Sequence, residues 1–272
     1  WEVASDGPIV NSDYSLDSCN QGFWDAERKR YAVYFRHLRN ESGESGIKAP
    51  GWKRDILVTF SKDFINWTEP QWLIYHRDDG RPGTELEHLY TNEVKPYKRA
   101  PHIYLGFPAQ FNGSVDPMLM ASRDGLHFYR WMEHPIIPKS APSDRDKIRS
   151  NHLWQEMVEL PEEPDKLSMY ASENLGIKGP HEDGSFPRVR RFTIRKDGFV
   201  SVRATAELGE LVTKPLIFAG NKLTVNYNAR LGEPGEIRVE ILDGEKHPIP
   251  GFALEDCDPL SNDDIDAGVR WK

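Results

Sequence analysis

Several carboxylates of this chain stand where an acid or a base could act on a bound ligand. Asp17 directly precedes Ser18-Cys19-Asn20, and Glu93 lies in the run Tyr-Thr-Asn-Glu-Val. One carboxyl that keeps its proton and one that is ionised can together supply the acid and the base or nucleophile of a hydrolytic reaction. We therefore predict Asp17 and Glu93 as candidate catalytic residues. The competing interpretations are a turn or cap position for Asp17 and an exposed strand position for Glu93.

Three further glutamates are candidates for the general acid. Glu156 and Glu159 lie in the run Leu-Trp-Gln-Glu-Met-Val-Glu-Leu, and Glu173 follows Ser-Met-Tyr-Ala-Ser. Because side chains alternate between the two faces of a strand, Glu156 and Glu159 cannot share one face. The alternative for each of the three is a solvated position on the surface.

Arginine and histidine offer a second kind of chemistry, the recognition of anionic groups. Arg99 and His102, in Arg-Ala-Pro-His, precede an aromatic strand. Arginine is suited to bidentate binding of a carboxylate or sulfate, although a structural salt bridge or a strand-end cap would use the same residues. Arg36 lies in an unusually apolar strand, and a buried arginine must be paired with a catalytic or a structural carboxylate. We predict all three as candidate ligand-binding residues.

The chain is rich in aromatic side chains, which make up 11% of it and include 8 tryptophans. Such residues either pack β-structure or present flat faces on which sugar rings can stack. We predict Trp24 and Trp154 as candidate stacking residues of a ligand site.

Composition and motifs exclude several classes of function. The formal net charge of −8 argues against nucleic acid as a partner, since phosphate binding needs a basic field. No apolar run approaches the ~18 residues that span a bilayer, so we predict no membrane segment. The sequence contains no His-Glu-x-x-His, Walker, GxGxxG or GxSxG motif and no dedicated calcium loop. We accordingly predict neither a cofactor nor a metal.

The two cysteines, Cys19 and Cys257, belong to no metal-binding motif. They are either buried thiols or the two ends of one long-range disulfide. The sequence does not indicate an oligomeric state. A secreted or periplasmic location is the expectation, with the compartment left open.

The elements that must position these residues are predicted to be β-strands throughout. Three times a short strand enters a turn of the type Ser/Arg-Lys/Arg-Asp and leaves as another strand, at Asp55–Trp67, Pro117–Phe128 and Val189–Val202. The turn residues Asp63, Asp124 and Asp197 are 61 and 73 residues apart. A repeat of this length with several strands per unit is typical of a β-propeller, with one blade per repeat. Propellers carry their chemistry near the central axis, so the turn itself is not expected to be the site.

Each repeat is expected to hold about four strands. The predicted strands of residues 1–205 are Tyr31–His37, Asp55–Phe60, Gln71–Tyr75, Tyr90–Pro96, Pro101–Phe107, Pro117–Ser122, His134–Pro138, Trp154–Leu160, Leu167–Ser172 and Val189–Ile194. In residues 206–272 the sequence pattern changes to short strands separated by turns. This pattern predicts a β-sandwich. Its predicted strands are Lys214–Phe218, Leu223–Asn228, Glu236–Asp243 and His247–Leu254.

The fold class is therefore predicted as all-β, with a partial propeller in residues 1–205 and a sandwich in residues 206–272. Three blades cannot close a ring, since propellers have ~4–8 blades. Open sheet edges are also a liability for a soluble protein. We expect the chain to be a fragment that lacks N-terminal blades and the last sandwich strands. The alternative is a fold other than a closed propeller.

The turn Ser61-Lys-Asp-Phe-Ile-Asn-Trp67 resembles the blade turns of five-bladed propeller glycosidases, glycoside hydrolase families 32, 43, 62 and 68. Nearly the whole chain resembles uncharacterised bacterial proteins described as glycosyl-hydrolase-family-32 N-terminal-like, a group with no settled substrate. In that group the pattern continues beyond Lys272. The matching stretches are Asp17–Asp25, Tyr31–Arg36, Tyr90–Asn92, Arg99–Pro108, Ser122–Gly125, Arg191–Val202 and Gly235–Leu260.

The resemblance implies a five-bladed propeller that acts on a carbohydrate with two or three carboxylates near its axis. In such enzymes an aspartate is the nucleophile or base, a glutamate is the acid, and a further aspartate orients the acid. The carboxyl groups lie about 5–5.5 Å apart in retaining enzymes and about 6.5–9.5 Å apart in inverting ones. The acid needs a raised pKa.

Asp116, in Val-Asp-Pro, resembles the aspartate of the family's Arg-Asp-Pro motif and is a further catalytic candidate. Val115 replaces the arginine, and the residue precedes the third strand of its blade, so an ordinary Asp-Pro turn is the alternative. The prediction is a glycoside hydrolase that cleaves a poly- or oligosaccharide. Two other functions are kept open: a non-catalytic carbohydrate-binding propeller, and an interaction scaffold that presents loops such as Asn40–Gly51 to a protein.

Overall fold

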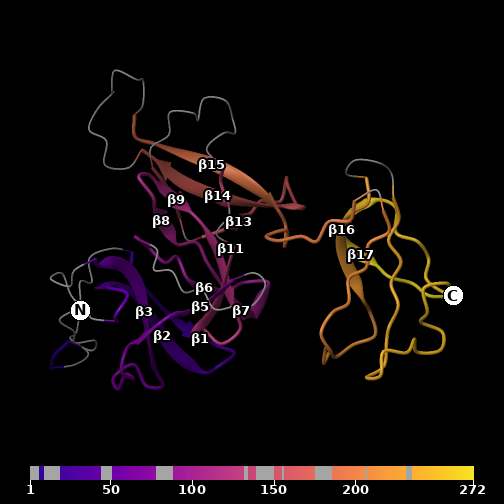
Figure 1. The fold of residues 1–272 in the computed structure, drawn as a ribbon, viewed down its shortest axis with the longest axis horizontal. Coiled ribbons are helices and arrows are strands. Elements are labelled where there is room, and N and C mark those ends of the chain that lie inside the picture. The colour runs from indigo at the N-terminus through magenta and orange to yellow at the C-terminus, as the bar shows by residue number, and fades with distance from the viewer. Residues whose placement is uncertain are drawn as a thin grey trace. The chain divides into compact units, whose positions relative to one another are not determined.

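Every regular element that the structure describes is a β-strand. The computed structural model describes residues 6–8, 19–43, 51–77, 88–131, 134–138, 150–154, 156–174, 186–205, 207–230 and 235–272. Within these ranges the all-β prediction is confirmed, and the sheets are open (Figure 1). No helix in them is long and apolar enough to cross a membrane. The chain divides into two compact units, one of Trp1–Met157 with Met169–Phe192 and one of Val158–Ser168 with Thr193–Lys272.

The first sheet is a four-stranded antiparallel meander. Its strands are β1 (Gln21–Asp25), β2 (Arg30–Arg39), β3 (Lys53–Ser61) and β4 (Gln71–Trp72), each paired with the next along the chain. The central pair β2–β3 runs in unbroken register from Tyr31↔Ser61 to Arg39↔Lys53. Its length follows from the apolar residues of both strands, which are buried along most of their extent.

The second sheet has the order β5-β11-β10-β7-β6. Four of its strands, β6 (Lys95–Tyr97), β7 (Ala100–Gly106), β10 (Leu119–Ser122) and β11 (His127–Trp131), form an antiparallel meander. The hairpin of β8 (Ala109–Phe111) and β9 (Val115–Pro117) interrupts it. β5 (Ile74–Arg77) adds to the outer edge in parallel with β11.

The predicted strand Gln71–Tyr75 is divided between these two sheets. Its first residues close the first sheet as β4, and the rest joins the second sheet as β5. The backbone changes partner at Leu73, whose N–H donates to Ile56, while the N–H of Ile74 donates to Leu126. Leu73 is buried between the sheets, which explains the change of partner. The predicted strand His134–Pro138 forms no strand.

The two sheets share one hydrophobic core. Buried side chains from both sheets and from the segment before β6 pack together. Aromatic residues contribute most of the buried apolar surface of such a core. The members are Ala32, Tyr34, Ile56, Val58, Leu73, Tyr75, Leu89, Val94, Tyr104, Met120 and Phe128.

The third sheet is built around β14 (Lys166–Glu173). β12 (Asn151–Leu153) and β13 (Val158–Glu159) pair with successive parts of β14, and β15 (Arg188–Arg195) also pairs with it. The predicted strand Trp154–Leu160 thus starts earlier and is interrupted before Val158.

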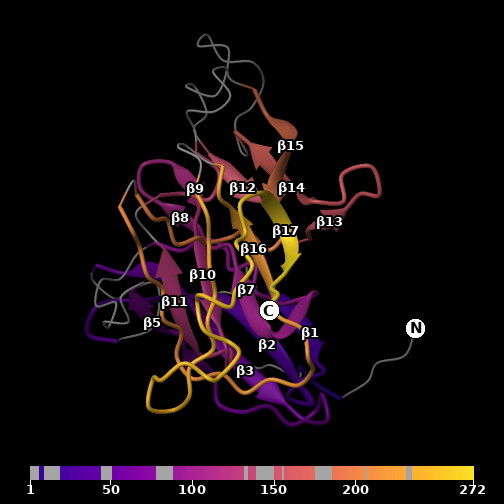
Figure 2. The same ribbon diagram turned by 90° about the vertical axis from the view of Figure 1, so that its right-hand side faces the viewer.

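In the second unit, β16 (Thr224–Asn228) and β17 (Asp263–Gly268) lie side by side as an antiparallel pair (Figure 2). The predicted strand Lys214–Phe218 is absent, and Glu236–Asp243 and His247–Leu254 make only isolated bridges. Both cysteines are free thiols; Cys257 is buried and Cys19 is exposed.

Candidate functional site

Three consecutive polar side chains are buried in the segment that leads into β6. Thr91, Asn92 and Glu93 are 4%, 0% and 7% exposed. Buried polar groups need hydrogen-bond partners, and these residues have them. The Thr91 hydroxyl accepts from the N–H of Ala109 at 3.3 Å. The Asn92 amide accepts from the N–H of Val94 at 3.2 Å and donates to the Cys19 carbonyl at 3.1 Å. The segment is therefore held rigidly against its neighbours.

Glu93 receives its partners from the start of the first sheet. The Gln21 side-chain amide donates to Glu93 Oε2 at 3.3 Å, and the Cys19 thiol also hydrogen-bonds to this carboxyl. Burial raises the pKa of Glu93 to about 7, while the Cys19 hydrogen bond and the charge of Lys95 act in the lowering direction. Burial thus moves the titration of this carboxyl group toward neutral pH.

The backbone of Glu93 is strained as well. Its φ is 45°, in the left-handed region, and Cys19 opposite it has a φ of 40°. Holding a non-glycine residue there costs about 1–3 kcal/mol, and such strain gathers at functional sites. A shifted pKa and a strained backbone are two separate physical signs, and both occur at Glu93. This carboxyl is the strongest candidate for chemistry among the described residues.

Glu156 lies close to this segment but in water. It is exposed and forms an ion pair with Lys95, two residues after Glu93. Glu159 is also exposed and pairs with Lys196 at 2.9 Å. Exposed pairs of this kind contribute little to stability. Neither glutamate has the burial that raises the pKa of Glu93.

Glu173 is buried and held by two arginines. It is 0% exposed, and the Nε atoms of Arg188 and Arg190 lie on its carboxylate, Arg190 at 3.2 Å from both oxygens. Both carboxylate oxygens of Glu173 are therefore engaged by the two guanidinium groups, which suits this residue to a structural role in the sheet.

Asp116 and Glu173 belong to one cross-strand row of polar residues. Asp116 pairs with Gln110 of β8, Val115 bridges in parallel to Ser150, and Asn151 pairs with Glu173. The row continues from Asp116 through Asn151, which is fully buried and whose amide has no hydrogen-bond partner among the described residues. Adjacent strands lie about 4.8 Å apart, and the strand of Asn151 lies between those of Asp116 and Glu173. The backbones at Asp116 and Glu173 are therefore roughly 10 Å apart.

The predicted ligand-binding residues occupy several places. Arg36 is buried in β2, and its Nη1 donates to the Tyr90 carbonyl at 3.1 Å. Arg99 lies in the β6–β7 turn, at the end of that hairpin away from Glu93, and His102 lies on β7; both are exposed. The two do not face Glu93 as one cluster.

Both predicted tryptophans are partly exposed. Trp24, on β1, is 47% exposed and packs edge-on against Tyr31, with ring centroids 4.7 Å apart. Trp154 is 49% exposed, and its indole N–H donates to the Ser172 hydroxyl at 2.9 Å. Asp17 lies outside the described residues.

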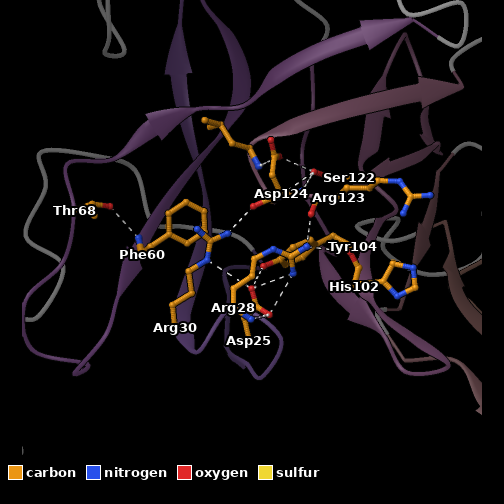
Figure 3. A network of polar contacts seen from close by, with 12 residues as sticks. Asp25, Arg28, Arg30, Phe60, Thr68, His102, Tyr104, Ser122, Arg123 and Asp124 are labelled. Atoms are coloured by element: carbon orange, nitrogen blue, oxygen red, sulfur yellow. Dashed lines mark hydrogen bonds and ion pairs between the residues drawn. The ribbon is translucent and has the colours of Figure 1, made fainter. Parts of the chain in front are cut away.

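A separate polar network joins the first sheet to the second (Figure 3). Asp25, fully buried at the end of β1, accepts from Arg28 and from the Tyr104 hydroxyl and pairs with Arg30. The two arginines also donate to the carbonyls of Arg123 and Asp124, in the second repeat turn. This network is structural, because every one of its cations meets an acceptor of the neighbouring sheet.

Sequence reasoning selected Glu93 but missed the side chains around it. Gln21, Cys19 and Asn92 had no role assigned, although Cys-Asn-Gln lies in a stretch that resembles the propeller glycosidases. Asn151 was missed as well, because its polar neighbours Ser150 and His152 give no sequence signal that it is buried.

The chain matches no protein-family model and no curated protein. It is similar to an N-acetylgalactosamine deacetylase from F. plautii in complex with blood group B trisaccharide, with 14% identity, a TM-score of 0.43, and coverage of 69% of this chain and 52% of that one. A putative glycosidase from Bacteroides thetaiotaomicron has 16% identity, a TM-score of 0.40, and coverage of 64% and 52%. A structure from the GH130 family, described as mannoside phosphorylases that contain glycoside hydrolases, has 15% identity, a TM-score of 0.33, and coverage of 59% and 48%. The chain spans about half the length of each.

Proposed function

We propose that this chain is a large part of a β-propeller glycoside hydrolase in which Glu93 is the general acid. The observation that carries the proposal is the buried Glu93 carboxyl with a pKa of about 7. Cleavage of a glycosidic bond requires a proton on the leaving oxygen, and an acid is most effective when its pKa lies near the working pH. An ordinary exposed glutamate would be ionised at neutral pH.

The neighbours of Glu93 suit this role. Gln21 and Cys19 hold the carboxyl in one orientation, and Asn92 fixes the Cys19 backbone. A general acid must be held in position, because proton transfer depends on its placement relative to the leaving oxygen. The contacts come from two sheets, so the site forms only when the first and second sheets are packed together.

We propose Asp17 as the second carboxylate. It precedes Cys19 by two residues, and two residues of chain span at most about 7 Å. Its closeness in the sequence to Cys19, a hydrogen-bond partner of Glu93, supports this proposal. Asp116 and Glu173 make a poorer acid–base pair, because the Glu173 carboxylate is already engaged by Arg188 and Arg190.

The propeller is part of the proposal. The first two sheets each contain four antiparallel strands in meander order, which is the arrangement of a blade. The strands that open these sheets, β1 and β6, contact each other. In a propeller such strands line the axis, where Glu93 would lie. The division into propeller blades in residues 1–205 and a sandwich in residues 206–272 is proposed with it, as is a carbohydrate substrate.

The test is hydrolysis of a panel of aryl furanosides and pyranosides with leaving groups of different acidity. We expect Glu93→Gln to lower kcat/KM about 100-fold or more on substrates with poor leaving groups. On activated substrates the loss should be much smaller, because their leaving groups need no proton. Glu156→Gln, at an exposed glutamate that pairs with Lys95 on the surface, is the matched control and should behave as wild type. No hydrolysis by the wild-type chain, or an unchanged Glu93→Gln variant, would contradict the proposal.

A non-catalytic carbohydrate-binding propeller is the second candidate. Two of the predicted catalytic carboxylates favour it, because both are engaged in ion pairs. Glu173 pairs with Arg188 and Arg190, and Glu156 pairs with Lys95. This function predicts glycan binding without turnover, and the binding should be unaffected by Asp17→Asn and Glu173→Gln. Turnover that depends on Glu93 would exclude it.

A further inference from the structure

A cluster of cationic and aromatic side chains surrounds Tyr90, three residues before Glu93. Arg36 and Arg54 share one face of the β2–β3 pair, because Ile56, two residues after Arg54, is the register partner of Arg36. The rings of Trp52, His88, Tyr90 and Phe111 surround them, with neighbouring ring centroids 5.3–6.1 Å apart. We call these six residues the Arg54 cluster.

The guanidinium of Arg54 lies against two aromatic rings. Its Cζ lies 4.2 Å from the Tyr90 ring centroid and 5.3 Å from that of Trp52, and Arg36 Cζ lies 5.6 Å from the Tyr90 ring. Within the described residues no carboxylate forms an ion pair with Arg54. The Nη1 group of Arg54 lies 3.4 Å from His88 Nδ1, and a stacked guanidinium can direct its remaining in-plane N–H groups at a planar anion. The Arg54 side chain is thus preorganised for an anionic group.

His88 adds a further donor. Its Nδ1 accepts from the backbone N–H of Arg54 at 3.2 Å, so Nδ1 is unprotonated and Nε2 carries the hydrogen. Burial lowers the pKa of His88, and the positive charges of Arg54, Lys53 and Arg36 lower it further. The local field at this ring is positive in a chain whose net charge is −8.

We propose that the Arg54 cluster binds the anionic substituent, a carboxylate or a sulfate, of a saccharide whose glycosidic bond is cleaved at Glu93. Phe111, which is 39% exposed, offers a face on which a sugar ring can stack beside the guanidinium groups. Tyr90 precedes Glu93 by three residues, a span of at most about 10 Å, so one oligosaccharide can reach both places. This inference rests on the proposed function for its position along the substrate, but the binding itself does not require Glu93.

The experiment is calorimetric binding of three probes to the full chain: a galacturonic acid hexamer, a sulfated galactose hexamer and neutral cellohexaose. We expect at least one anionic probe to bind and the neutral probe to bind at least tenfold more weakly. Preference for the first or for the second anionic probe identifies a carboxylate or a sulfate as the recognised group. Binding of cellohexaose as tight as that of both anionic probes, or no binding of either anionic probe, would overturn the proposal.

Variants separate recognition from packing. Arg54→Gln should weaken binding of the anionic probe about tenfold or more, since a hydrogen bond to a charged group is worth about 1.5–3 kcal/mol. Arg54→Lys keeps the positive charge and the aliphatic stem of the side chain. Its affinity for the anionic probe should lie between those of wild type and Arg54→Gln. Arg77→Gln, an exposed arginine on β5, is the control and should bind as wild type. Unchanged affinity in folded Arg54→Gln and Arg54→Lys would contradict the proposal.

Failure of this inference can be told from failure of the proposed function. If Glu93→Gln abolishes hydrolysis of neutral substrates while Arg54→Gln changes no affinity, the cluster is structural and the glycosidase stands. If the anionic probes bind through Arg54 while no substrate is hydrolysed, the cluster is a recognition site of a binding protein.

Discussion

Asp63 and Asp124 hold two turns in the same way, 61 residues apart. In each turn the carboxylate accepts from the backbone N–H groups two and three residues further on, at 2.7–2.9 Å. In each the serine two residues earlier accepts from the backbone and donates to the carboxylate. The side chain three residues on, Asn66 or His127, completes the turn at 2.7 Å. The sequence repeat therefore has a physical basis in hydrogen bonds.

Removing the second of these carboxylates should destabilise the protein. We expect Asp124→Ala to lower the free energy of unfolding by about 1 kcal/mol, as for other carboxylates that cap backbone N–H groups. Burial acts to raise the pKa of Asp124, but hydrogen bonds from His127, Leu126 and Ser122 lower it to about 2. The contribution is therefore present above the unfolded pKa of about 3.9 and is lost as the pH falls toward 2. Urea unfolding from pH 7 to pH 2.5 measures the difference, which should shrink below pH 4.

The Asp63→Ala variant provides the comparison. Hydrogen bonds from Asn66 and Ile65 hold the pKa of Asp63 well below its usual range, but this carboxylate is fully exposed. The backbone carbonyls of the Asp124 turn also accept hydrogen bonds from the side chains of Arg28 and Arg30. We expect the smaller loss in Asp63→Ala. A larger loss there than in Asp124→Ala would show that the contact between the sheets does not depend on the shape of the second turn.

The third copy of the repeat looked equivalent in the sequence and is a different turn. Arg195 replaces the serine, and an arginine side chain cannot accept from the backbone. Gly198 instead donates to the Arg195 carbonyl at 2.9 Å, and Asp197 itself takes the left-handed conformation, with a φ of 57°. The Arg195 side chain reaches Asp263 of β17 at 2.6 Å. One substitution in a motif was enough to change the structure.

Strands with an alternating apolar pattern were largely predictable, and a polar strand was not. Tyr31–His37 and Asp55–Phe60 fall within β2 and β3, and Pro101–Phe107 coincides with β7 up to Gly106, since alternating apolar residues and a neighbouring strand both favour them. β17 was missed because its polar sequence has no such pattern and it pairs with β16, some 35 residues earlier. Lys214–Phe218 has the pattern but finds no partner among the described residues.

The candidate site, too, could be predicted from the sequence only in part. A glutamate flanked by apolar residues drew attention to Glu93, but its partners Gln21 and Cys19 lie more than 70 residues earlier, as the separation of 72 for Gln21 shows. The burial that raises its pKa is a property of the packed sheets. The left-handed backbone at a glutamate is equally invisible in a sequence, because glycine is the residue expected there.

Glu93 should give the stability of the protein a distinctive dependence on pH. Its folded pKa, about 7, is raised from 4.5. The protonated form is thus favoured by folding, and this stability is fully present below about pH 4.5 and lost as the pH rises through 7. The loss is on the order of 3 kcal/mol. We expect the difference in unfolding free energy between wild type and Glu93→Gln to change by this order between pH 4.5 and 8.

Three histidines oppose this trend and require a difference measurement. Burial lowers the pKa of His37, His88 and His152, so their titration raises stability with pH in a similar range. Subtracting the Glu93→Gln curve from the wild-type curve removes their contribution. Glu156→Gln should leave the slope as it is. A flat difference curve would mean that Glu93 titrates as an ordinary surface glutamate, and the general-acid proposal would lose its support.

Glu173 should matter more for stability than for proton transfer. Its replacement by glutamine leaves Arg188 and Arg190 facing a neutral group, and breaking a buried pair in this way costs about 3–5 kcal/mol. We expect Glu173→Gln to unfold at clearly lower urea concentration. Glu163→Gln, which removes an exposed pair with Lys166 at 3.0 Å, should change stability by less than about 1 kcal/mol. If Glu173→Gln abolished hydrolysis with stability intact, Glu173 would be a catalytic residue after all.

The left-handed position of the two equivalent turns is filled by different residues. Phe64 occupies it in the first turn with a φ of 67°, and Gly125 in the second with a φ of 86°. A Cβ at Gly125 would lie 2.7 Å from the Tyr34 hydroxyl and 3.1 Å from the Tyr104 ring. The Tyr34 hydroxyl donates to the Gly125 carbonyl at 2.6 Å, which fixes the tyrosine in place. The glycine is thus favoured by its left-handed φ and is required in addition by the closeness of the neighbouring sheet.

Substitution at the two positions should therefore have unequal effects. Gly125→Ala adds left-handed strain and a clash with Tyr34, together about 2–4 kcal/mol, because a fixed aromatic residue cannot move aside. Phe64→Gly relieves strain and loses the edge contact with Tyr31, whose centroid is 4.9 Å away, so these effects offset each other to within about 1 kcal/mol. Urea unfolding followed by tryptophan fluorescence measures both. Restoring stability to Gly125→Ala by adding Tyr34→Phe would locate the clash at the hydroxyl, whereas equal losses in the two turns would place the constraint in the turn alone.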